Sequence, residues 1–229
     1  MRIRSISLVA AVSAVLASSS SASAETPREL LALASFEDAD RSAALAHVNA
    51  ANGLAAQVLT RSPSDYDASL VQAMAVGYRA KLLGSRSEAM EARRRFEALV
   101  LRKPGDAEAQ LALAAWHMGA LHRLGRIVGG AVLGARRSSA MAAMDRAVRL
   151  APGRPFIAGL AGLLRLQSDP LDGRGTQLIE IAAQGRAATP LDASLRRASR
   201  AMLPVIRAGD VERIRRAASA QLPLGKLSL

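Results

Sequence analysis

The chain has 229 residues, and its 31 lysine and arginine residues outnumber its 19 aspartate and glutamate residues, for a formal net charge of +12. It has no cysteine, which excludes disulfide bonds, thiolate metal ligands, a cysteine nucleophile and a lipid attached through cysteine. Aromatic residues make up 3% of the chain and do not interleave the arginines, so no nucleic-acid partner is expected. The positive charge is suited to anionic lipid or acidic proteins.

The N-terminal segment, residues 1–24, has the organisation of a cleavable signal peptide. A positively charged start precedes an apolar run over residues 6–17, and Ala22-Ser23-Ala24 matches the small-x-small cleavage pattern. The run is shorter than the roughly 20 apolar residues of a membrane-spanning helix, so a retained anchor is the competing interpretation. We expect a mature chain that starts near Glu25 and has no integral membrane segment. The arginine- and alanine-rich composition is typical of a high-GC bacterium, so we expect a periplasmic protein, with secretion beyond the cell as the alternative.

One spacing recurs along the middle of the chain: a proline is followed 21 residues later by a glycine. Each interval predicts a helix that starts after the proline and ends at the glycine in the left-handed conformation. A helical hairpin that recurs every 40-odd residues predicts a stacked repeat, because no single unit can bury its apolar face alone. The three pairs are Pro63/Gly84, Pro104/Gly125 and Pro152/Gly173.

Capping residues mark the predicted helix starts. Asp65 and Asp106 follow the first two prolines, where an N-cap side chain accepts hydrogen bonds from first-turn amides. Ser85 and Glu88 have the spacing of a reciprocal capping box, which predicts a second helix that ends before Pro104.

The predicted second helices resemble those of tetratricopeptide repeats. The stretch up to Pro152 matches the signature of a small residue, a large residue, alanine and proline, and the stretch up to Pro104 matches it with leucine at the alanine position. The matching residues are Ala140, Met144, Ala147 and Pro152, and Ala92, Phe96, Leu99 and Pro104. The chain therefore resembles exported bacterial tetratricopeptide-like proteins, among them the periplasmic T component of TRAP transporters and regulators of microtubule dynamics. The proline spacings of 41 and 48 residues depart from the 34-residue unit of that family.

We accordingly expect an all-α chain, a tetratricopeptide-like helical-hairpin solenoid with atypical capping helices. The expected organisation is a signal peptide (1–24), an N-terminal helical cap (25–62), the repeat core (63–173) and a C-terminal helical cap (174–229). One or two helices are expected in the first cap, and helices over 176–188, 191–208 and 210–222 in the second. Atypical end units are expected because their outer faces meet water.

Seven residues are candidates for partner or ligand binding. Some lie on the first helices of the hairpins, which line the concave surface of a repeat superhelix, although core packing is the alternative for the aromatic ones. Others lie within or just before a glycine-rich insertion over residues 125–137. This insertion is either a mobile lid that presents arginines to an anionic ligand or a helix extension or buried connector. The candidates are Tyr78, Arg79, Trp116, Arg123, Arg126, Arg136 and Arg137.

No catalytic, metal or cofactor site is expected. His117 and His122 are five residues apart and point about 140° away from each other on a helix, so they do not chelate one metal. The expected function is a non-enzymatic scaffold for protein–protein interaction in the cell envelope, with a homo-oligomer as one form of it. The alternative, implied by the resemblance to the transporter component, is a periplasmic small-ligand-binding component associated with a transporter, although that family is typically anchored through a cysteine.

Overall fold

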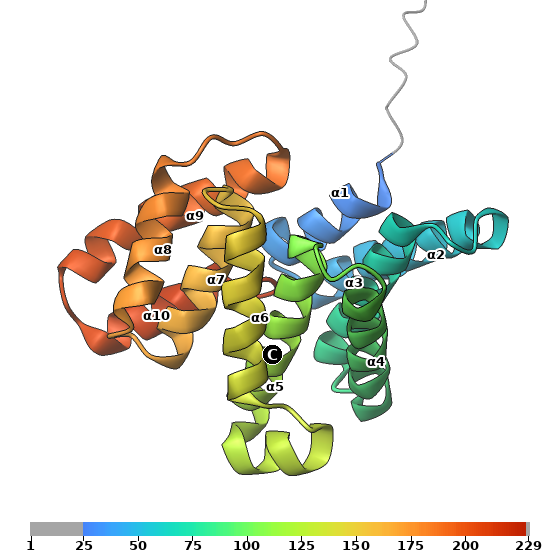
Figure 1. Cartoon of the computed structure of the whole chain (residues 1–229), viewed down its shortest axis with the longest axis horizontal. Coiled ribbons are helices and arrows are strands. Elements are labelled where there is room, and N and C mark those ends of the chain that lie inside the picture. Colours follow the sequence, from blue (N-terminus) through green and yellow to red (C-terminus); the bar gives the residue numbers. More distant parts are fainter. Residues whose placement is uncertain (1–24, 228–229) are drawn as a thin grey trace, which may run out of the picture.

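The structure is a computed structural model that describes residues 25–227, all of them helical or connecting, with no strand among them (Figure 1). The predicted signal peptide lies outside the described residues. Within the described range, no helix is long and apolar enough to cross a membrane. The elements are α1 (Pro27–Ala32), the π-helical turn η1 (Leu33–Glu37), α2 (Arg41–Arg61), α3 (Tyr66–Leu83), α4 (Arg86–Arg102), α5 (Ala107–Leu133), α6 (Arg137–Leu150), α7 (Pro155–Ser168), α8 (Gly173–Gln184), α9 (Pro190–Arg207) and α10 (Val211–Gln221). The all-α prediction is confirmed.

Aspartate caps begin many of these helices. The side chain of Asp65 accepts a hydrogen bond from the amide of Ala68, and that of Asp106 from the amide of Ala109, both at 2.8 Å. These bonds satisfy amides that have no partner inside the helix, and they confirm the two predicted caps. The same cap begins α2, α8 and α10, at Asp40, Asp172 and Asp210.

The glycines that were predicted to end helices behave differently from one another. Gly84 ends α3 in the left-handed conformation, with φ of 70°, as predicted. Gly125 also has positive φ, 76°, but a further helical segment follows it to the end of α5. The prediction for Gly173 is wrong: α7 ends at Ser168, and Gly173 is the first residue of α8. The cause is local, because Asp172 caps the new helix immediately before this glycine.

The predicted capping box at the start of α4 is half correct. The hydroxyl of Ser85 accepts a hydrogen bond from the amide of Glu88 at 3.4 Å. The carboxylate of Glu88 does not return to Ser85 but accepts from Nε of Arg79 on α3, at 2.9 Å. A contact between two helices has therefore replaced the local reciprocal bond.

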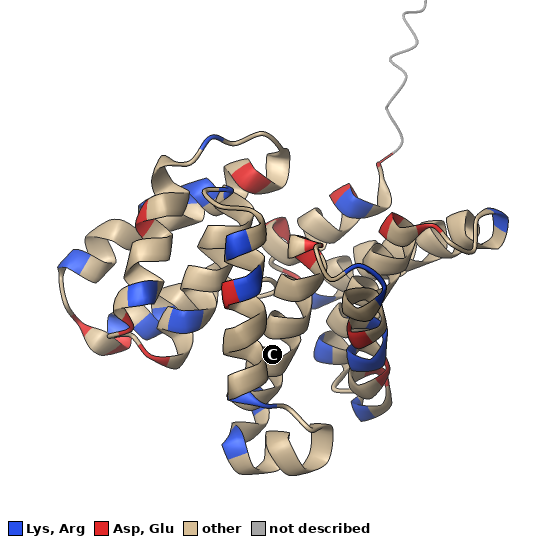
Figure 2. Ribbon diagram, in the orientation of Figure 1, with Lys and Arg blue, Asp and Glu red and all other residues tan. Residues whose placement is uncertain are grey.

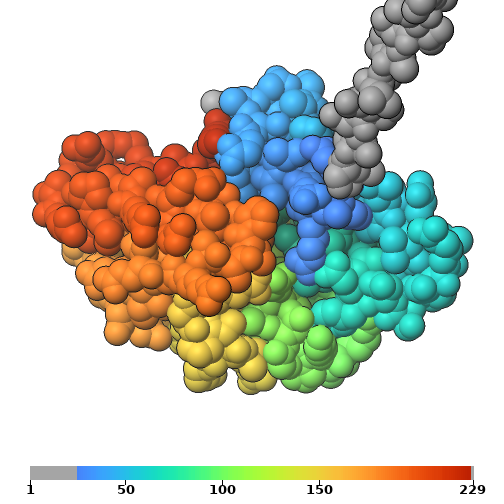
Figure 3. Space-filling model, turned by 90° about the horizontal axis from the view of Figure 1, so that it is seen from above, coloured from blue at the N-terminus to red at the C-terminus, as the bar shows by residue number. Residues whose placement is uncertain are grey.

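The helices pack as successive neighbours along the chain. α3 lies against α4, α5 against α6, α7 against α8 and α9 against α10. The first members of these pairs also contact one another in order, α3 with α5, α5 with α7 and α7 with α9. Seen from above, the blue N-terminal residues lie between the red C-terminal helices and the cyan residues (Figure 3).

The largest core surrounds α7. Every residue of α7 from Pro155 to Gln167 is buried, and α5, α6, α8, α9 and α10 all contact this helix. The sequence explains this position, because Arg165 is the one charged residue of α7 and a helix that is apolar on all sides is stable only when surrounded. The guanidinium of Arg165 pairs with Asp145 at 2.6 Å and with Asp172 at 3.1 Å, whereas its buried Nε has no hydrogen-bond partner among the described residues.

The two ends of the described chain meet against α3. The amide of Leu224 donates to the carbonyl of Ser35 at 2.8 Å, and the ammonium of Lys81 donates to the carbonyl of Pro223 at 2.9 Å. Leucines from both ends share one apolar cluster with α2 and α3. The C-terminal tail, residues 222–227, and the α1–η1 segment therefore cover one face of α3. The leucines are Leu30, Leu31, Leu224 and Leu227.

Candidate functional site

The two aromatic candidates lie in different apolar clusters. Tyr78 packs against the cluster formed by the two chain ends, and burial raises the pKa of its phenol. Trp116 packs against the cluster of Phe96, and its Nε1 donates to the carbonyl of Ala89 on α4 at 2.8 Å. The guanidinium of Arg93 covers the indole, 5.7 Å from the ring centroid. Neither ring lines either of the two grooves described below, and the two rings belong to separate clusters.

The arginine candidates gather around the glycine-rich insertion, which we call the α5–α6 tip and define as residues 123–137. The tip folds because Gly125 turns the chain at a φ of 76° and residues 126–133 then return as a short helix. A Cβ at Gly129 would lie 3.1 Å from the carbonyl oxygen of Ala120, so glycine is what allows the two helical segments to approach. Gly134 ends the short helix with a φ of 67°.

The tip exposes apolar side chains. Ile127 is 86% exposed, Val128 48% and Leu124 37%. The short helix projects at the bottom of Figure 1, beyond the packed ends of α5 and α6. The insertion is thus a turn followed by a short second helix, which leaves Leu124, Ile127 and Val128 exposed and buries Leu133.

The tip is also cationic and carries no acid of its own. No aspartate or glutamate occurs between Glu108 and Asp145, and the tip in Figure 2 carries blue segments and no red. None of its four arginines forms an ion pair among the described residues. Arg123 donates to the carbonyl of Lys81 at 2.7 Å and Arg137 donates to Ser168, whereas the side chains of Arg126 and Arg136 have no hydrogen bond in the described part of the chain. Arg79, away from the tip, is paired with Glu88.

Titratable groups near the tip are shifted toward their neutral forms. Burial, with a further contribution from Arg123, lowers the pKa of Lys81 to about 8. Burial lowers the pKa of His117 to about 4, and Arg93 adds to the effect. The pKa of His122 is lowered by burial and by the charge of Lys81. The two histidines do not converge, and no group of three or more potential metal ligands occurs within residues 25–227.

An ion-pair network that the sequence did not reveal joins the helix starts. Arg28 on α1 binds Asp67 and Glu108, the latter at 2.7 Å. Arg154 then binds Glu108 at 2.8 Å and the buried carboxylate of Asp192 at 3.2 Å. The partners are 38 to 80 residues apart, so no spacing within one helix could have indicated them.

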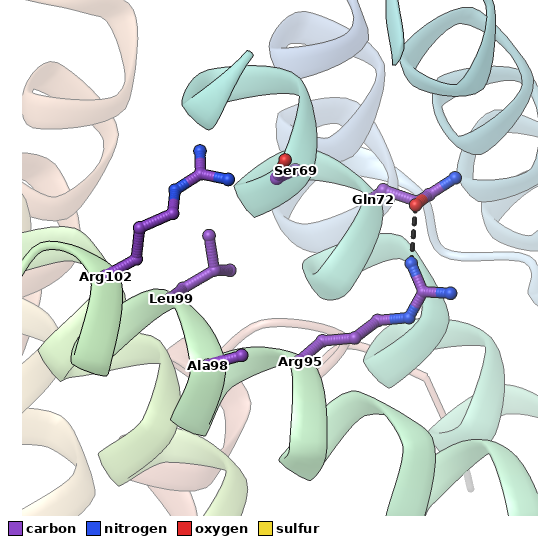
Figure 4. A pocket seen from close by; sticks show the side chains of 6 residues that line it. All are labelled: Ser69, Gln72, Arg95, Ala98, Leu99 and Arg102. Carbon is purple, nitrogen blue, oxygen red and sulfur yellow. Dashed lines mark hydrogen bonds between the residues drawn. The ribbon is translucent and has the colours of Figure 1, made fainter. Parts of the chain in front are cut away.

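A shallow groove lies between α3 and α4, which we call the α3–α4 groove (Figure 4). Its volume is about 220 Å³. Leu99 and Ala98 supply apolar surface, Arg95 is held by a hydrogen bond to Gln72, and Arg102 lies across from Ser69 (Figure 4). A second groove of about 270 Å³ lies where η1, α9 and the C-terminal tail meet.

No protein-family model, curated protein or solved structure matches this chain.

Proposed function

We propose that the chain is a non-enzymatic protein-binding module, a tetratricopeptide-like scaffold of the cell envelope. The observation that carries the proposal is the row of helical pairs, in which α3, α5, α7 and α9 contact one another in order. Stacked helical hairpins form extended surfaces that hold segments of other proteins. The proline-terminated second helices of the pairs are consistent with this assignment.

The chain's own ends support a peptide-holding role for this architecture. The α1–η1 segment and the C-terminal tail lie on α3 through buried leucines, and the main-chain carbonyl of Pro223 accepts a hydrogen bond from Lys81 of α3. The two ends are joined to each other by the main-chain bond from Leu224 to Ser35. Apolar anchors combined with main-chain bonds are the usual means by which a protein holds a peptide segment. Because these ends cover the surface around Tyr78, a partner has to bind elsewhere.

The α3–α4 groove is the surface that we assign to the partner. Its apolar floor at Ala98 and Leu99 suits a side-chain anchor, and Arg102, which has no acidic partner among the described residues, favours a segment that carries a carboxylate. Arg95 is already paired with Glu91, at 2.7 Å. Tyr66 holds Arg102 in place, with the guanidinium 4.8 Å from the ring centroid. An acidic peptide segment with one apolar anchor is therefore the expected occupant.

The geometry favours this role over the alternative of a small-ligand carrier. Pockets for small ligands measure roughly 300 to 1,000 Å³ and enclose most of the ligand. The α3–α4 groove, at about 220 Å³, and the groove at the C-terminal tail, at about 270 Å³, are smaller and open to solvent. A protein segment that continues beyond the groove needs no enclosure.

The test places a photoreactive amino acid at Ala98 and, as a matched control, at Ala142, an exposed alanine on α6. We expect Ala98 to cross-link one envelope protein in cells, and Ala142 to give no such product. The purified partner should then bind the unmodified chain, lose roughly tenfold or more in affinity for Ala98→Arg, and keep its affinity for Ala142→Arg. Equal binding by the two arginine variants, or no cross-linked partner at Ala98, would remove the proposal.

A further inference from the structure

We propose that the α5–α6 tip docks on an anionic membrane surface. Leu124, Ile127 and Val128 enter the interface between headgroups and acyl chains, while Arg126 and Arg136 contact the lipid phosphates. This interaction goes beyond the proposed protein-binding role and uses a different surface of the chain.

The apolar part of the argument is the concentration of exposed side chains. Three large apolar residues with more than a third of their surface exposed fall within the five residues 124–128. Elsewhere such side chains stand singly, for example Leu101 in the last turn of α4 and Leu171 in the connection after α7. Single exposed hydrophobic residues are ordinary, whereas a contiguous exposed group marks a contact surface.

The shape of the tip selects a membrane over a peptide or protein groove. Ile127 and Val128 belong to the short helix that projects from the tip, and Leu124 comes just before the turn at Gly125 (Figure 1). None of the three lines either of the two grooves described above. A projecting apolar helix flanked by cations is the geometry with which interfacial helices insert a few ångströms into a bilayer.

The charge of the tip specifies the lipid. Arg126 and Arg136 are exposed and have neither an ion pair nor a side-chain hydrogen bond among residues 25–227, and the segment that carries them has no acid between Glu108 and Asp145. The neighbouring Glu97 of α4 is itself paired with Arg93 at 2.7 Å. Each arginine near an anionic leaflet gains binding free energy, whereas a zwitterionic surface offers far less. We therefore expect a requirement for anionic lipid.

The tip is already formed, so that binding does not have to order it. Arg93 on α4 donates to the carbonyl of Leu133 at 2.9 Å, and Arg86 donates to the carbonyl of Val132 at 3.4 Å. Together with the close approach at Gly129, these bonds hold the short helix with its apolar side outward. A preorganised surface loses less entropy on binding than a flexible one.

The experiment is vesicle flotation of the chain that begins at Glu25, with phosphatidylcholine vesicles that contain either no anionic lipid or about 30 mol% phosphatidylglycerol. The apolar variant is Ile127→Ser with Val128→Ser, and its control is Leu171→Ser, at a residue that is 75% exposed. The charge variant is Arg126→Gln with Arg136→Gln, and its control is Arg61→Gln with Arg207→Gln, two exposed arginines at the ends of α2 and α9. Circular dichroism verifies that all variants fold.

We expect the unmodified chain to float with the anionic vesicles and to remain at the bottom of the gradient when the vesicles are neutral. The charge variant should lose about 25-fold in partitioning, since one arginine near an anionic surface contributes roughly fivefold. The apolar variant should lose about tenfold or more, and both controls should stay within about twofold of the unmodified chain.

Three results would overturn the proposal: no binding to anionic vesicles, equal binding to both vesicle types, or tip variants that bind like their controls. A protein cross-linked through Ile127 in the absence of vesicle binding would reassign the tip to a protein partner. Because Ala98 and Ile127 lie on different surfaces, failure here leaves the outcome at the α3–α4 groove unaffected.

Discussion

The close packing of α7 against α8 and α9 predicts opposite effects of the same substitution at two helical glycines. Gly53 lies inside α2, and a Cβ added there would meet nothing within 4 Å. Gly159 lies inside α7, and its Cβ would be 2.9 Å from the hydroxyl of Ser199, 3.3 Å from Cβ of Leu195 and 3.4 Å from Cβ of Ala182. Two of these three atoms are Cβ atoms of neighbouring helices and move only with the backbone.

The magnitude follows from two terms. Alanine is favoured over glycine in a helix interior by about 1 kcal/mol, so Gly53→Ala should stabilise the protein by up to that amount. Gly159→Ala gains the same term but overpacks the core, which costs about 1 to 3 kcal/mol, so that the net effect is a destabilisation of up to about 2 kcal/mol. For a chain of this size, about 1 kcal/mol corresponds to roughly 2 to 4 °C in melting temperature.

The assay is thermal and urea unfolding followed by circular dichroism. We expect Gly53→Ala to melt above the unmodified chain and Gly159→Ala to melt below it. Replacing Ser199 with alanine removes the closest clash, and the hydroxyl of Ser199 has no hydrogen-bond partner to lose. The double variant Gly159→Ala/Ser199→Ala should therefore recover part of the loss. Equal stabilisation at Gly53 and Gly159 would refute the packing of α7 described above.

Three further predictions concern groups that only the tertiary contacts bring together. Asp192→Ala removes the buried partner of Arg154 and the carboxylate that completes the capping box with Thr189, the N-cap of α9. It should lower the free energy of unfolding by about 3 kcal/mol, with Asp192→Asn losing less. The pKa of His117 is depressed in the folded state, so the unfolded chain binds the proton first as the pH falls below about 6.5. The free energy of unfolding should therefore drop between pH 6.5 and pH 4 by at most about 3 kcal/mol. In urea unfolding, His117→Gln should flatten that part of the pH profile. If the His117→Gln variant keeps the full dependence of stability on pH, that dependence does not come from His117 and its neighbours Arg93 and Arg136. Removing residues 223–229 should expose Tyr78. Ultraviolet titration of the two tyrosines should then show one phenol pKa move down toward its ordinary value of about 10. An unchanged titration curve would mean that the C-terminal tail does not cover this ring.

The helices themselves could be predicted from the sequence because their signals are local. Asp65 and Asp106 cap their helices through amides three residues away, and Gly84 ends α3 through its own backbone freedom. The same local reasoning failed at Gly173. The spacing predicted that a helix ends at this glycine, whereas the aspartate immediately before it caps the start of a new helix.

The candidate site was predictable only in part. The four arginines of residues 123–137 were identified as candidates from the sequence, and Gly125 was predicted to end a helix where the structure has a turn. That Ile127 points into solvent was not predictable, because the same apolar run satisfies a buried connector equally well. The exposed orientation results from Gly129 packing directly on the backbone of Ala120.

The sequence by itself determined the helical class, the caps and the positive charge of the tip, since each depends on residues within one or two helical turns of one another. The tertiary structure alone decided which surfaces are open. The C-terminal tail covers Tyr78 through contacts such as that between Lys81 and Pro223, which are 142 residues apart, and Glu88 turns from Ser85 to Arg79 on another helix. Burial of a side chain depends on what packs against it from distant parts of the chain, and no local pattern records those partners.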